Sequence, residues 1–211
     1  VWPDRLMMIF ARDLLTNSPG SSVVFDVKSS KRLGELIEQY SGVPIMCKTG
    51  HSHIRKTVRD TNALLGGEFS GHLFFNDRWY GFDDGCYAAM RLLEVLSAQK
   101  HGDVSSLDQM ISEFEPTSYT PEILIPVTED NKFRIMQTLI SECKFPGGTI
   151  SPLDGLRVEY EHGWGLIRAS NTTPNLTLRF EAENNLELEI IKQHFLAEIE
   201  PFINHLKDHI K

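Results

Sequence analysis

The seven-residue stretch Gly66–His72 places a carboxylate, a hydroxyl and an imidazole close together in the chain. Three of the seven residues are glycine, so the backbone can turn tightly and approach a ligand closely. If the stretch is extended, Glu68, Ser70 and His72 point to one face while Phe69 packs behind them. A carboxylate accepts two hydrogen bonds and a hydroxyl both donates and accepts, which suits the hydroxyl groups of a sugar. The alternative is a hairpin with polar residues on its wet face.

A second polar stretch, Arg168–Pro174, combines an arginine with residues that favour turns. Arg168 offers a planar fork of hydrogen-bond donors that fits a phosphate group. Ser170, Asn171 and Thr172 add side-chain donors, and such residues tend to expose backbone N–H groups in turns. These residue types suit an anionic ligand, and a polar hairpin turn is the alternative.

Two single residues could also face a ligand. Lys28 follows a buried strand and precedes a helix, a position that often faces the ligand crevice of an α/β domain. His51 begins a helix, where anions bind and a histidine can donate to phosphate or sugar oxygens. The alternatives are a solvated lysine and a capping or surface histidine. His51, His53 and His72 do not have the spacing of a zinc signature, so no metal site is expected.

Composition narrows the class of protein. The chain has 211 residues, of which 41% are apolar and 24% charged, as in globular proteins that bury a core. A formal net charge of −8 argues against general nucleic-acid binding but allows a small phosphorylated ligand. We expect no membrane segment, because no stretch approaches about 18 continuous apolar residues. Cys47, Cys86 and Cys143 are interpreted as reduced core thiols of a cytosolic protein.

Strands and helices alternate over residues 1–115, which indicates an α/β layered domain with a mixed sheet flanked by helices. Apolar residues at helical spacing and residues that break helices place most of the boundaries. The expected elements are a helix over 3–15, strands over 22–27 and 43–48 with a helix between them, a helix from His51, strands over 65–69 and 72–76, and a helix capped by Asp83 that ends near Gln99.

Residues 115–121 resemble a linker, so we place a domain boundary after residue 115. Residues 116–211 are predicted to form a smaller α+β domain, with an antiparallel sheet of about four strands and helices on one face. Residues 176–183 alternate between apolar and polar side chains, so one face of this strand should be buried and the other wet or functional. The expected elements are strands over 122–127, 149–151, 156–161, 164–169 and 176–183, and helices capped by Asp130 and Asn185.

Three motifs together resemble the bacterial phosphomannomutase/phosphoglucomutase enzymes of the α-D-phosphohexomutase superfamily. Glu68–His72, followed by Trp79–Gly85, is similar to the sugar-binding loop of this family. Lys48–Ser52 and Arg168–Pro174 resemble two further segments, the latter being the family's phosphate-binding loop. The motifs occur in the family's order from one end of the chain to the other, which makes the resemblance specific.

The resemblance implies a domain organisation. The family has four domains, and this chain resembles only the third, sugar-binding domain over residues 1–115 and the fourth, phosphate-binding domain over residues 116–211. The family's phosphoserine and its aspartate-rich magnesium loop lie in the first two domains and have no counterpart here. The chain therefore looks like the C-terminal part of a longer protein. Mg²⁺ and a glucose or mannose 1,6-bisphosphate activator are expected of that protein, whereas this part alone should be inactive.

The resemblance also implies an activity, the isomerisation of hexose 1-phosphate to hexose 6-phosphate through a phosphoserine and a 1,6-bisphosphate. Glu68 and Ser70 would hold the sugar hydroxyls at positions 3 and 4, and His72 would belong to the same substrate-binding set. No catalytic residue is expected within this chain itself. Lys28 and His51 would line the active site, and the phosphate that is not reacting would be held by Arg168, Ser170, Asn171 and Thr172.

The expected partners are therefore hexose phosphates of mannose or glucose, with no nucleic acid and no membrane, and the protein is expected to be a cytoplasmic monomer. The choice among mannose, glucose and glucosamine phosphate stays open. An alternative is a sugar-phosphate-binding module without catalysis. A third hypothesis, a structural or interaction protein, predicts no binding of a sugar phosphate.

Overall fold

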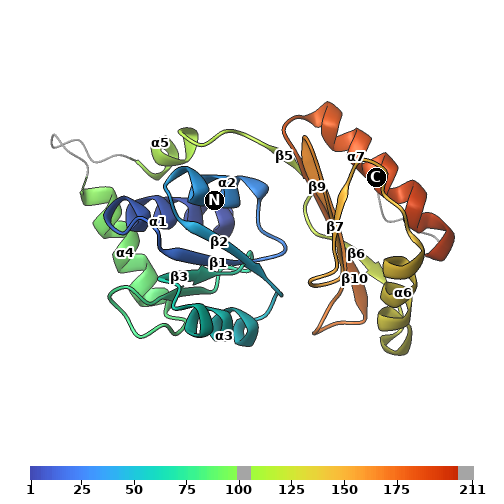
Figure 1. Ribbon diagram of the computed structural model, residues 1–211, viewed down its shortest axis with the longest axis horizontal. Helices are drawn as coiled ribbons and strands as arrows, with labels where there is room; N and C mark the ends of the chain where they lie inside the picture. Colours follow the sequence, from blue (N-terminus) through green and yellow to red (C-terminus); the bar gives the residue numbers. More distant parts are fainter. Residues whose placement is uncertain (99–105, 204–211) are drawn as a thin grey trace. The chain divides into compact units, whose positions relative to one another are not determined.

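The structure, a computed structural model, describes residues 1–98 and 106–203. The chain divides into two compact units, Val1–Glu115 and Pro116–Lys211. Figure 1 shows a sheet flanked by helices in the first unit and an antiparallel sheet with helices in the second. Both fold classes predicted from the sequence are confirmed. Among the described residues, no helix is both long and apolar enough to cross a membrane.

The first domain contains four short strands and five helices in its described part. In chain order these are α1 (Pro3–Asn17), β1 (Ser22–Asp26), α2 (Lys31–Gln39), β2 (Val43–Cys47), α3 (His51–Thr61), β3 (Leu65–Gly67), β4 (Leu73–Phe75), α4 (Gly85–Ser97) and α5 (Leu107–Ser112). The predicted elements are all present, with ends that differ by a few residues. The predicted end of the long helix at Gln99 lies outside the described residues.

The sheet of the first domain has the strand order β2-β1-β3-β4. β1 pairs in parallel with both β2 and β3, whereas β4 runs antiparallel to β3. Val23 and Phe25 of β1 pack in the core under α1, α2 and α4, while Val24 packs on the opposite face with α3. Because β1, β2 and β3 point the same way, their carboxyl ends meet at one edge, where an α/β domain binds ligands.

Two glycines of the predicted sugar loop have a packing role in this sheet. A Cβ atom on Gly66 would lie 2.4 Å from Val58 Cγ2, and one on Gly67 would lie 2.4 Å from Met7 Sδ. Both distances are far below van der Waals contact, so any larger residue would push α3 or α1 away from β3. The sequence predicts close approach of a ligand at these glycines, and the structure shows close approach of two helices.

Three predicted helix caps are wrong by one or two residues. Asp84, and not Asp83, caps α4, with its side chain accepting a hydrogen bond from the backbone N–H of Tyr87. Asn184 caps α7 in the same way, and Thr128 precedes α6 without a side-chain cap. At α4 and α7 the sequence offers two adjacent Asp or Asn residues, and only backbone geometry decides which one caps. The shift at α4 leaves Asp83 available for another partner.

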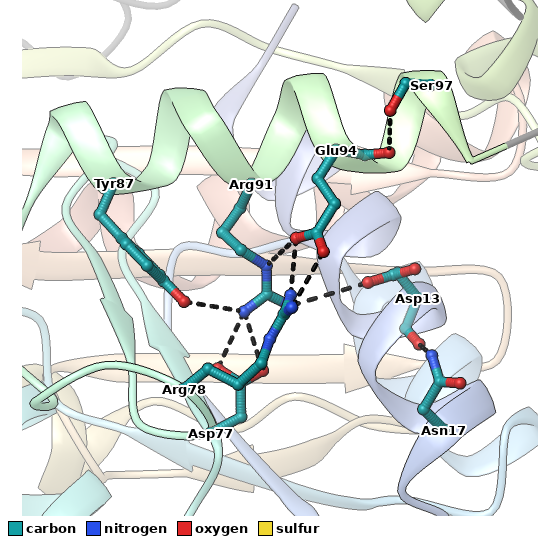
Figure 2. Close-up of polar contacts among 8 residues, drawn as sticks. All are labelled: Asp13, Asn17, Asp77, Arg78, Tyr87, Arg91, Glu94 and Ser97. Carbon is teal, nitrogen blue, oxygen red and sulfur yellow. Dashed lines mark hydrogen bonds and ion pairs between the residues drawn. The ribbon is translucent and has the colours of Figure 1, made fainter.

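A buried arginine fixes the segment that carries Asp83 (Figure 2). Arg91 points from α4 to Asp77, and its Nη1 atom donates to both carboxylate oxygens at 2.9 and 2.8 Å. Its Nη2 and Nε atoms also lie within ion-pair distance of Asp13 on α1 and Glu94 on α4. The arginine is 4% exposed, so these charge-assisted bonds form largely out of water. They tie the start of the segment between β4 and α4 to two helices.

The second domain contains six strands and two α-helices in its described part. In chain order these are β5 (Ser118–Tyr119), β6 (Ile123–Pro126), α6 (Glu129–Glu142), β7 (Thr149–Ser151), β8 (Leu156–Tyr160), β9 (Gly163–Ala169), β10 (Asn175–Ala182) and α7 (Asn185–Ile199), followed by the 3₁₀ helix η1 (Glu200–Phe202). The prediction of about four strands is therefore too low. β5 is only two residues long and lies within the predicted linker, so it has no alternation that a sequence pattern could reveal.

The sheet of the second domain follows the order β5-β10-β9-β8-β7, and β6 also pairs with β10. Its described pairings are antiparallel, and one face packs with α6 and α7 around the largest apolar cluster. The other face of β10 was predicted to be wet or functional, and it is not wet, because Thr177, Arg179 and Glu181 are 5%, 2% and 3% exposed. Trp164 of β9 lies on that face and donates from Nε1 to Glu181 Oε1 at 3.3 Å. The polar side chains of this face therefore lie within the protein and are not directed to solvent.

The cysteines differ from the prediction at one position. Cys47 and Cys143 are buried and form no disulfide with another described cysteine, but Cys86 is exposed on α4. Burial raises the pKa of the Cys143 thiol to about 11, so this thiol is inert at neutral pH. The apolar pattern around Cys86 belongs to the other side of α4, which explains why the sequence placed this thiol in the core.

Candidate functional site

A buried aspartate organises the carboxyl edge of the first sheet. Asp26, the last residue of β1, is 0% exposed. Its carboxylate accepts hydrogen bonds from Ser29 Oγ at 2.9 Å, Thr49 Oγ1 at 3.1 Å and the backbone N–H of Phe69 at 3.1 Å. Burial raises the pKa of Asp26, while the nearby Lys28 charge and these bonds oppose the rise. One carboxylate thus ties together the segments that follow β1, β2 and β3.

The sequence analysis did not single out Asp26. The only available signal was a charged residue inside the apolar run of β1, at the position where the strand ends. A charged residue in a buried strand needs partners, and the strand's carboxyl end is where loops can supply them.

The predicted sugar loop is a tight hairpin turn between β3 and β4 and not an extended segment. The N–H of Gly71 donates to the carbonyl of Glu68 at 2.9 Å, and the N–H of Glu68 donates to the carbonyl of His72 at 3.0 Å. Gly71 has φ +98°, which favours glycine. Because of the turn, Glu68 is only 2% exposed, whereas Ser70 and His72 are exposed. The three side chains lie in one turn but do not share one face.

Glu68 bridges this turn and the start of α3. Its Oε2 atom accepts a hydrogen bond from the backbone N–H of Gly50 at 3.0 Å. Its Oε1 atom has no hydrogen-bond partner among the residues that the structure describes. Burial raises the pKa of Glu68, the neighbouring Asp26 charge adds to the rise, and the Gly50 bond opposes it. The carboxyl group is therefore fixed through one oxygen and has bonding capacity left on the other.

His72 is held by an aspartate from a separate segment. His72 Nδ1 lies 2.6 Å from Asp83 Oδ2, and Asp83 Oδ1 accepts from the backbone N–H of Leu73 at 3.2 Å. Asp83 also forms an isolated β-bridge with Phe74, so its backbone is fixed beside β4. The His51 ring packs edge-on against the His72 ring, with centroids 5.8 Å apart. The structure thus brings together Glu68, His72 and His51, and it adds Asp83, which the sequence analysis treated as a helix cap.

Lys28 lies beside the same turn and is 7% exposed. Its Nζ atom lies 5.6 Å from the centroid of the Phe69 ring, and Phe69 itself stacks on Trp2 of the segment before α1. A lysine over an aromatic face is held in place while keeping its charge. Lys28 is therefore part of the cluster around the turn and not the solvated residue that the alternative predicted.

His51 also lines a cavity of about 610 Å³. Arg55, Lys56 and Arg59 of α3 line one wall, and Tyr80 lines another. Lys56 and Arg59 also pair with Asp60, the neighbouring carboxylate on the same helix. Three cations and one carboxylate leave a local positive charge in a chain whose net charge is −8, and such a region attracts anions toward His51.

In the second domain, Arg168 lies at the end of β9 and not in a loop. It pairs in register with Thr177 of β10, and its side chain is 6% exposed. Its Nε atom donates to Asp154 Oδ2 at 3.0 Å, whereas its buried Nη2 atom has no hydrogen-bond partner among the described residues. The guanidinium is therefore oriented by one carboxylate and keeps a donor that no described group accepts.

Ser170–Pro174 form the turn between β9 and β10. Ser170 Oγ accepts from the backbone N–H of Thr173 at 3.2 Å and from its Oγ1 hydroxyl at 2.9 Å. Asn171 and Thr172 are exposed at the tip. Lys132 of α6 is bonded to the same turn, since its Nζ atom donates to the carbonyls of Ser170 at 2.7 Å and Thr173 at 3.3 Å. The sequence analysis missed Lys132, which reads as an ordinary polar residue in an amphipathic helix.

No group of three or more His, Cys, Asp or Glu side chains in residues 1–98 and 106–203 is placed to hold a metal ion. His51 and His72 are near each other, but their histidine–aspartate contact serves orientation and does not form a ligand set.

Fold and sites together define a class: an α/β/α domain followed by an antiparallel α+β domain, with one polar turn in each. Comparison with known proteins identifies that class. The sequence family described as "Phosphoglucomutase/phosphomannomutase, alpha/beta/alpha domain III" matches residues 2–116. The one described as "Phosphoglucomutase/phosphomannomutase, C-terminal domain" matches residues 122–198. The chain therefore belongs to the phosphoglucomutase/phosphomannomutase family.

Individual relatives agree with this assignment. The chain is 52% identical over 195 residues to a phosphomannomutase/phosphoglucomutase of Pseudomonas aeruginosa, covering 92% of this chain and 41% of the relative. It is 47% identical over 204 residues to a phosphoglucomutase of Neisseria gonorrhoeae, covering 95% and 43%. A crystal structure of a phosphoglucomutase/phosphomannomutase family protein from Burkholderia thailandensis superposes with a TM-score of 0.86 at 40% identity, covering 97% and 43%. The chain thus spans about two fifths of the length of the curated relatives that it matches.

Proposed function

We propose that this chain is the ligand-recognising part of an isomerase that interconverts hexose 1-phosphate and hexose 6-phosphate, with mannose or glucose as the sugar. The observation that carries the proposal is the turn Glu68–His72. It fixes one carboxylate oxygen of Glu68 on Gly50 and leaves the other without a partner in the described part of the chain. The names of the relatives, phosphomannomutase/phosphoglucomutase and phosphoglucomutase, support the same reaction class.

In this proposal the first turn binds the sugar. Glu68 and Ser70 hold the hydroxyls at positions 3 and 4, since a carboxylate accepts from both and a hydroxyl bonds in either sense. Glucose and mannose share these hydroxyls, so the grip does not discriminate between the two epimers. It also accepts a sugar in either direction, which an exchange of phosphate between positions 1 and 6 requires.

His72 takes part by hydrogen bonding. Its Nδ1 atom is held by the Asp83 carboxylate, which leaves Nε2 for a hydrogen bond to the ligand. Since the His72 side chain is 48% exposed, Nε2 can reach a sugar hydroxyl. His51 and Lys28 lie beside the first turn and contribute hydrogen bonds and positive charge near the reacting phosphate.

The second turn holds the phosphate that is not reacting. Arg168 contributes its free donor, and Ser170, Asn171 and Thr172 contribute hydroxyl, amide and backbone donors. Charge-assisted hydrogen bonds of this kind are short and about twice as strong as neutral ones. Holding one phosphate firmly positions the sugar for transfer of the other.

The remaining chemistry belongs to a longer protein. A phosphoserine, Mg²⁺ and a glucose or mannose 1,6-bisphosphate are expected there, where Mg²⁺ would neutralise charge on the transferring phosphoryl group. The described residues of this chain form no group of three or more His, Cys, Asp or Glu side chains placed to hold a metal ion, and in this proposal the ligands of Mg²⁺ belong to the rest of the longer protein. We further place the protein in the cytoplasm as a monomer that acts on hexose phosphates, without nucleic acid or membrane as a partner.

The test uses a longer protein that contains this chain, assayed with mannose 1-phosphate and with glucose 1-phosphate. Glu68→Ala should lower kcat/KM by about 10- to 100-fold for both sugars, because charge-assisted hydrogen bonds are lost. Glu38→Ala, which removes an exposed carboxylate on α2, is the matched control and should leave both rates unchanged. A steep loss for one epimer with none for the other would contradict the role of Glu68. The 211-residue chain alone should show no turnover, whereas turnover by it would contradict a purely recognising role.

A further inference from the structure

The second domain contains a lysine that is buried beneath the turn Ser170–Pro174. Lys132 of α6 has a side chain that is only 1% exposed. Its ammonium group donates to the carbonyls of Ser170 and Thr173 and forms an ion pair with Glu129 Oε1 at 2.6 Å. An ammonium has three donors, and these three contacts use all of them. Burying an ammonium is unfavourable unless it is fully paired, so this arrangement holds the two carbonyls firmly.

The contact with Ser170 fixes the direction of the next peptide N–H group. A trans peptide is planar, so its C=O and N–H point in opposite directions. With the carbonyl of Ser170 directed to Lys132, the N–H of Asn171 points away from α6. Among the described residues, no hydrogen bond is formed by this N–H group, and Asn171 is exposed. Carbonyl oxygens would repel an anion. In this turn the carbonyls of Ser170 and Thr173 point to Lys132, and the N–H of Asn171 points to the opposite side.

We propose that Lys132 is a positioning residue for phosphate binding by this turn. It orients the carbonyls of Ser170 and Thr173 away from the ligand and leaves the N–H of Asn171 and the hydroxyl of Thr172 facing it. The inference rests on the proposed function, in which the turn holds the distal phosphate. It adds a residue from another element whose role is to shape the backbone without touching the ligand.

The chain offers a matched control for this role. Lys192 of α7 is also largely buried, with a side chain that is 11% exposed. It also pairs with the glutamate three residues earlier, since its Nζ lies 2.7 Å from Glu189 Oε1. Lys192 has no described hydrogen bond to the turn between β9 and β10. Replacing either lysine by methionine removes the same charge and the same type of ion pair. Only Lys132→Met also releases the carbonyl of Ser170 and removes one of the two hydrogen bonds to the carbonyl of Thr173, which accepts as well from the N–H of Asn175 at 2.8 Å.

The experiment compares amide NMR spectra of the 211-residue chain and its variants, first without ligand and then in titrations with mannose 1-phosphate. Without ligand, Lys132→Met should shift the amide resonances of residues 170–173, whereas Lys192→Met should leave them in place. With ligand, Lys132→Met should weaken binding by about tenfold or more, and Lys192→Met should bind as the wild type does. Thermal melts of each variant show whether it is folded.

Three results would contradict either the role of Lys132 or the proposed function on which it rests. A Lys132→Met spectrum identical to the wild type at residues 170–173, or equal affinity of the two, overturns the role of Lys132. If the wild type shows no ligand shifts at the turn, the proposed function fails, and the ligand-free spectra alone decide whether Lys132 sets the loop geometry. If Lys132→Met does not fold, Lys132→Gln, which keeps a side-chain donor, is used with the same readouts. The proposal then requires an intermediate affinity, and unchanged binding overturns it.

Discussion

Each of the two polar turns of this protein is hydrogen-bonded to a buried charged side chain, and the two charges have opposite signs. In the first domain, the carboxylate of Asp26 accepts hydrogen bonds from Ser29, Thr49 and the backbone of Phe69. In the second, the ammonium of Lys132 donates to the backbone carbonyls of Ser170 and Thr173. A buried anion collects donors and a buried cation collects acceptors, so each charge determines which backbone groups remain for a ligand.

This difference matches the chemistry proposed for each turn. The first turn has its Phe69 N–H occupied by Asp26, and it presents a carboxyl oxygen, a hydroxyl and an imidazole, which suit a ligand rich in hydroxyls. The second turn has carbonyls bonded to Lys132 and offers the N–H group of Asn171, hydroxyls and a guanidinium, which suit an anion. The comparison teaches that the polarity of a binding turn is set by a residue beneath it as well as by the residues in it.

The largest effect should follow from removing the buried anion. Asp26→Ala removes the acceptor of three hydrogen bonds, two of which, from Ser29 and Phe69, are buried, and the loss of a buried hydrogen-bond partner costs about 1–3 kcal/mol. We expect the free energy of unfolding of the first domain to fall by about 3 kcal/mol or more. Amide hydrogen exchange, measured at β1 and β3, reports this quantity residue by residue, and the amides of β10 serve as an internal reference.

Asp60→Ala is the control for this prediction, because Asp60 is an exposed carboxylate on α3 whose pairs with Lys56 and Arg59 lie in water. It should change stability by no more than about 0.5 kcal/mol. An Asp26→Ala protein whose β1 amides exchange like those of the wild type would show that Asp26 does not hold the loops together.

A smaller effect should appear in the pH dependence of stability. Burial raises the pKa of Asp26 and of Glu68 above their ordinary values of 3.8 and 4.5. The folded chain therefore holds these protons more tightly than the unfolded chain, so their contribution is present at low pH and is lost as pH rises through the raised values. Replacing Glu68 by glutamine removes one of the two groups, so Glu68→Gln should lose less stability than the wild type over that range.

Urea unfolding of the wild type and Glu68→Gln, followed from about pH 4 to about pH 7, measures this difference. Asp84→Asn keeps a side-chain acceptor for the α4 cap and serves as a control, since this capping aspartate is only partly buried. Parallel pH profiles for the wild type and Glu68→Gln would mean that Glu68 does not titrate above its ordinary range.

Much of the fold follows from local patterns. The apolar spacing of α1, α2 and β1 and the breaks between them place these elements within a few residues of their observed ends. β5 could not be predicted, because two residues carry no periodicity and the pairing with β10 depends on distant chain. The burial of the polar face of β10 could not be predicted for a related reason. Alternation identifies two faces, but it does not show that Trp164 of the neighbouring β9 lies on the polar one, in contact with Arg179 of β10 and Arg157 of β8.

The sequence identified the turns of the candidate site but not the residues beneath them. Glu68, His72 and the stretch around Ser170 were recognised because they occur in short motifs. Asp26 and Lys132 act across 43 and 38 residues of sequence separation, so no local spacing reveals them. Asp83 was assigned as a cap because the pattern offered two adjacent aspartates, and only the position of His72 across the sheet gives it a different partner.

The most direct test of the account is an NMR titration of the chain with mannose 1-phosphate. Wild-type shifts should centre on residues 168–174, and Arg168→Ala should weaken binding by about ten- to a hundredfold, because charge-assisted hydrogen bonds are lost. Arg168→Lys should restore only part of the affinity, since lysine keeps the charge but loses the planar fork. Arg134→Ala, which removes an exposed arginine of α6, should bind as the wild type does.

Thermal melts accompany the titration, because Arg168 is buried and paired with Asp154. If Arg168→Ala is unfolded, the lysine variant decides, and the account requires it to bind more weakly than the wild type while remaining folded. Wild-type shifts that map away from residues 168–174, or an Arg168→Ala protein that is folded and binds as well as the wild type, would contradict the assignment of the second turn as the phosphate site.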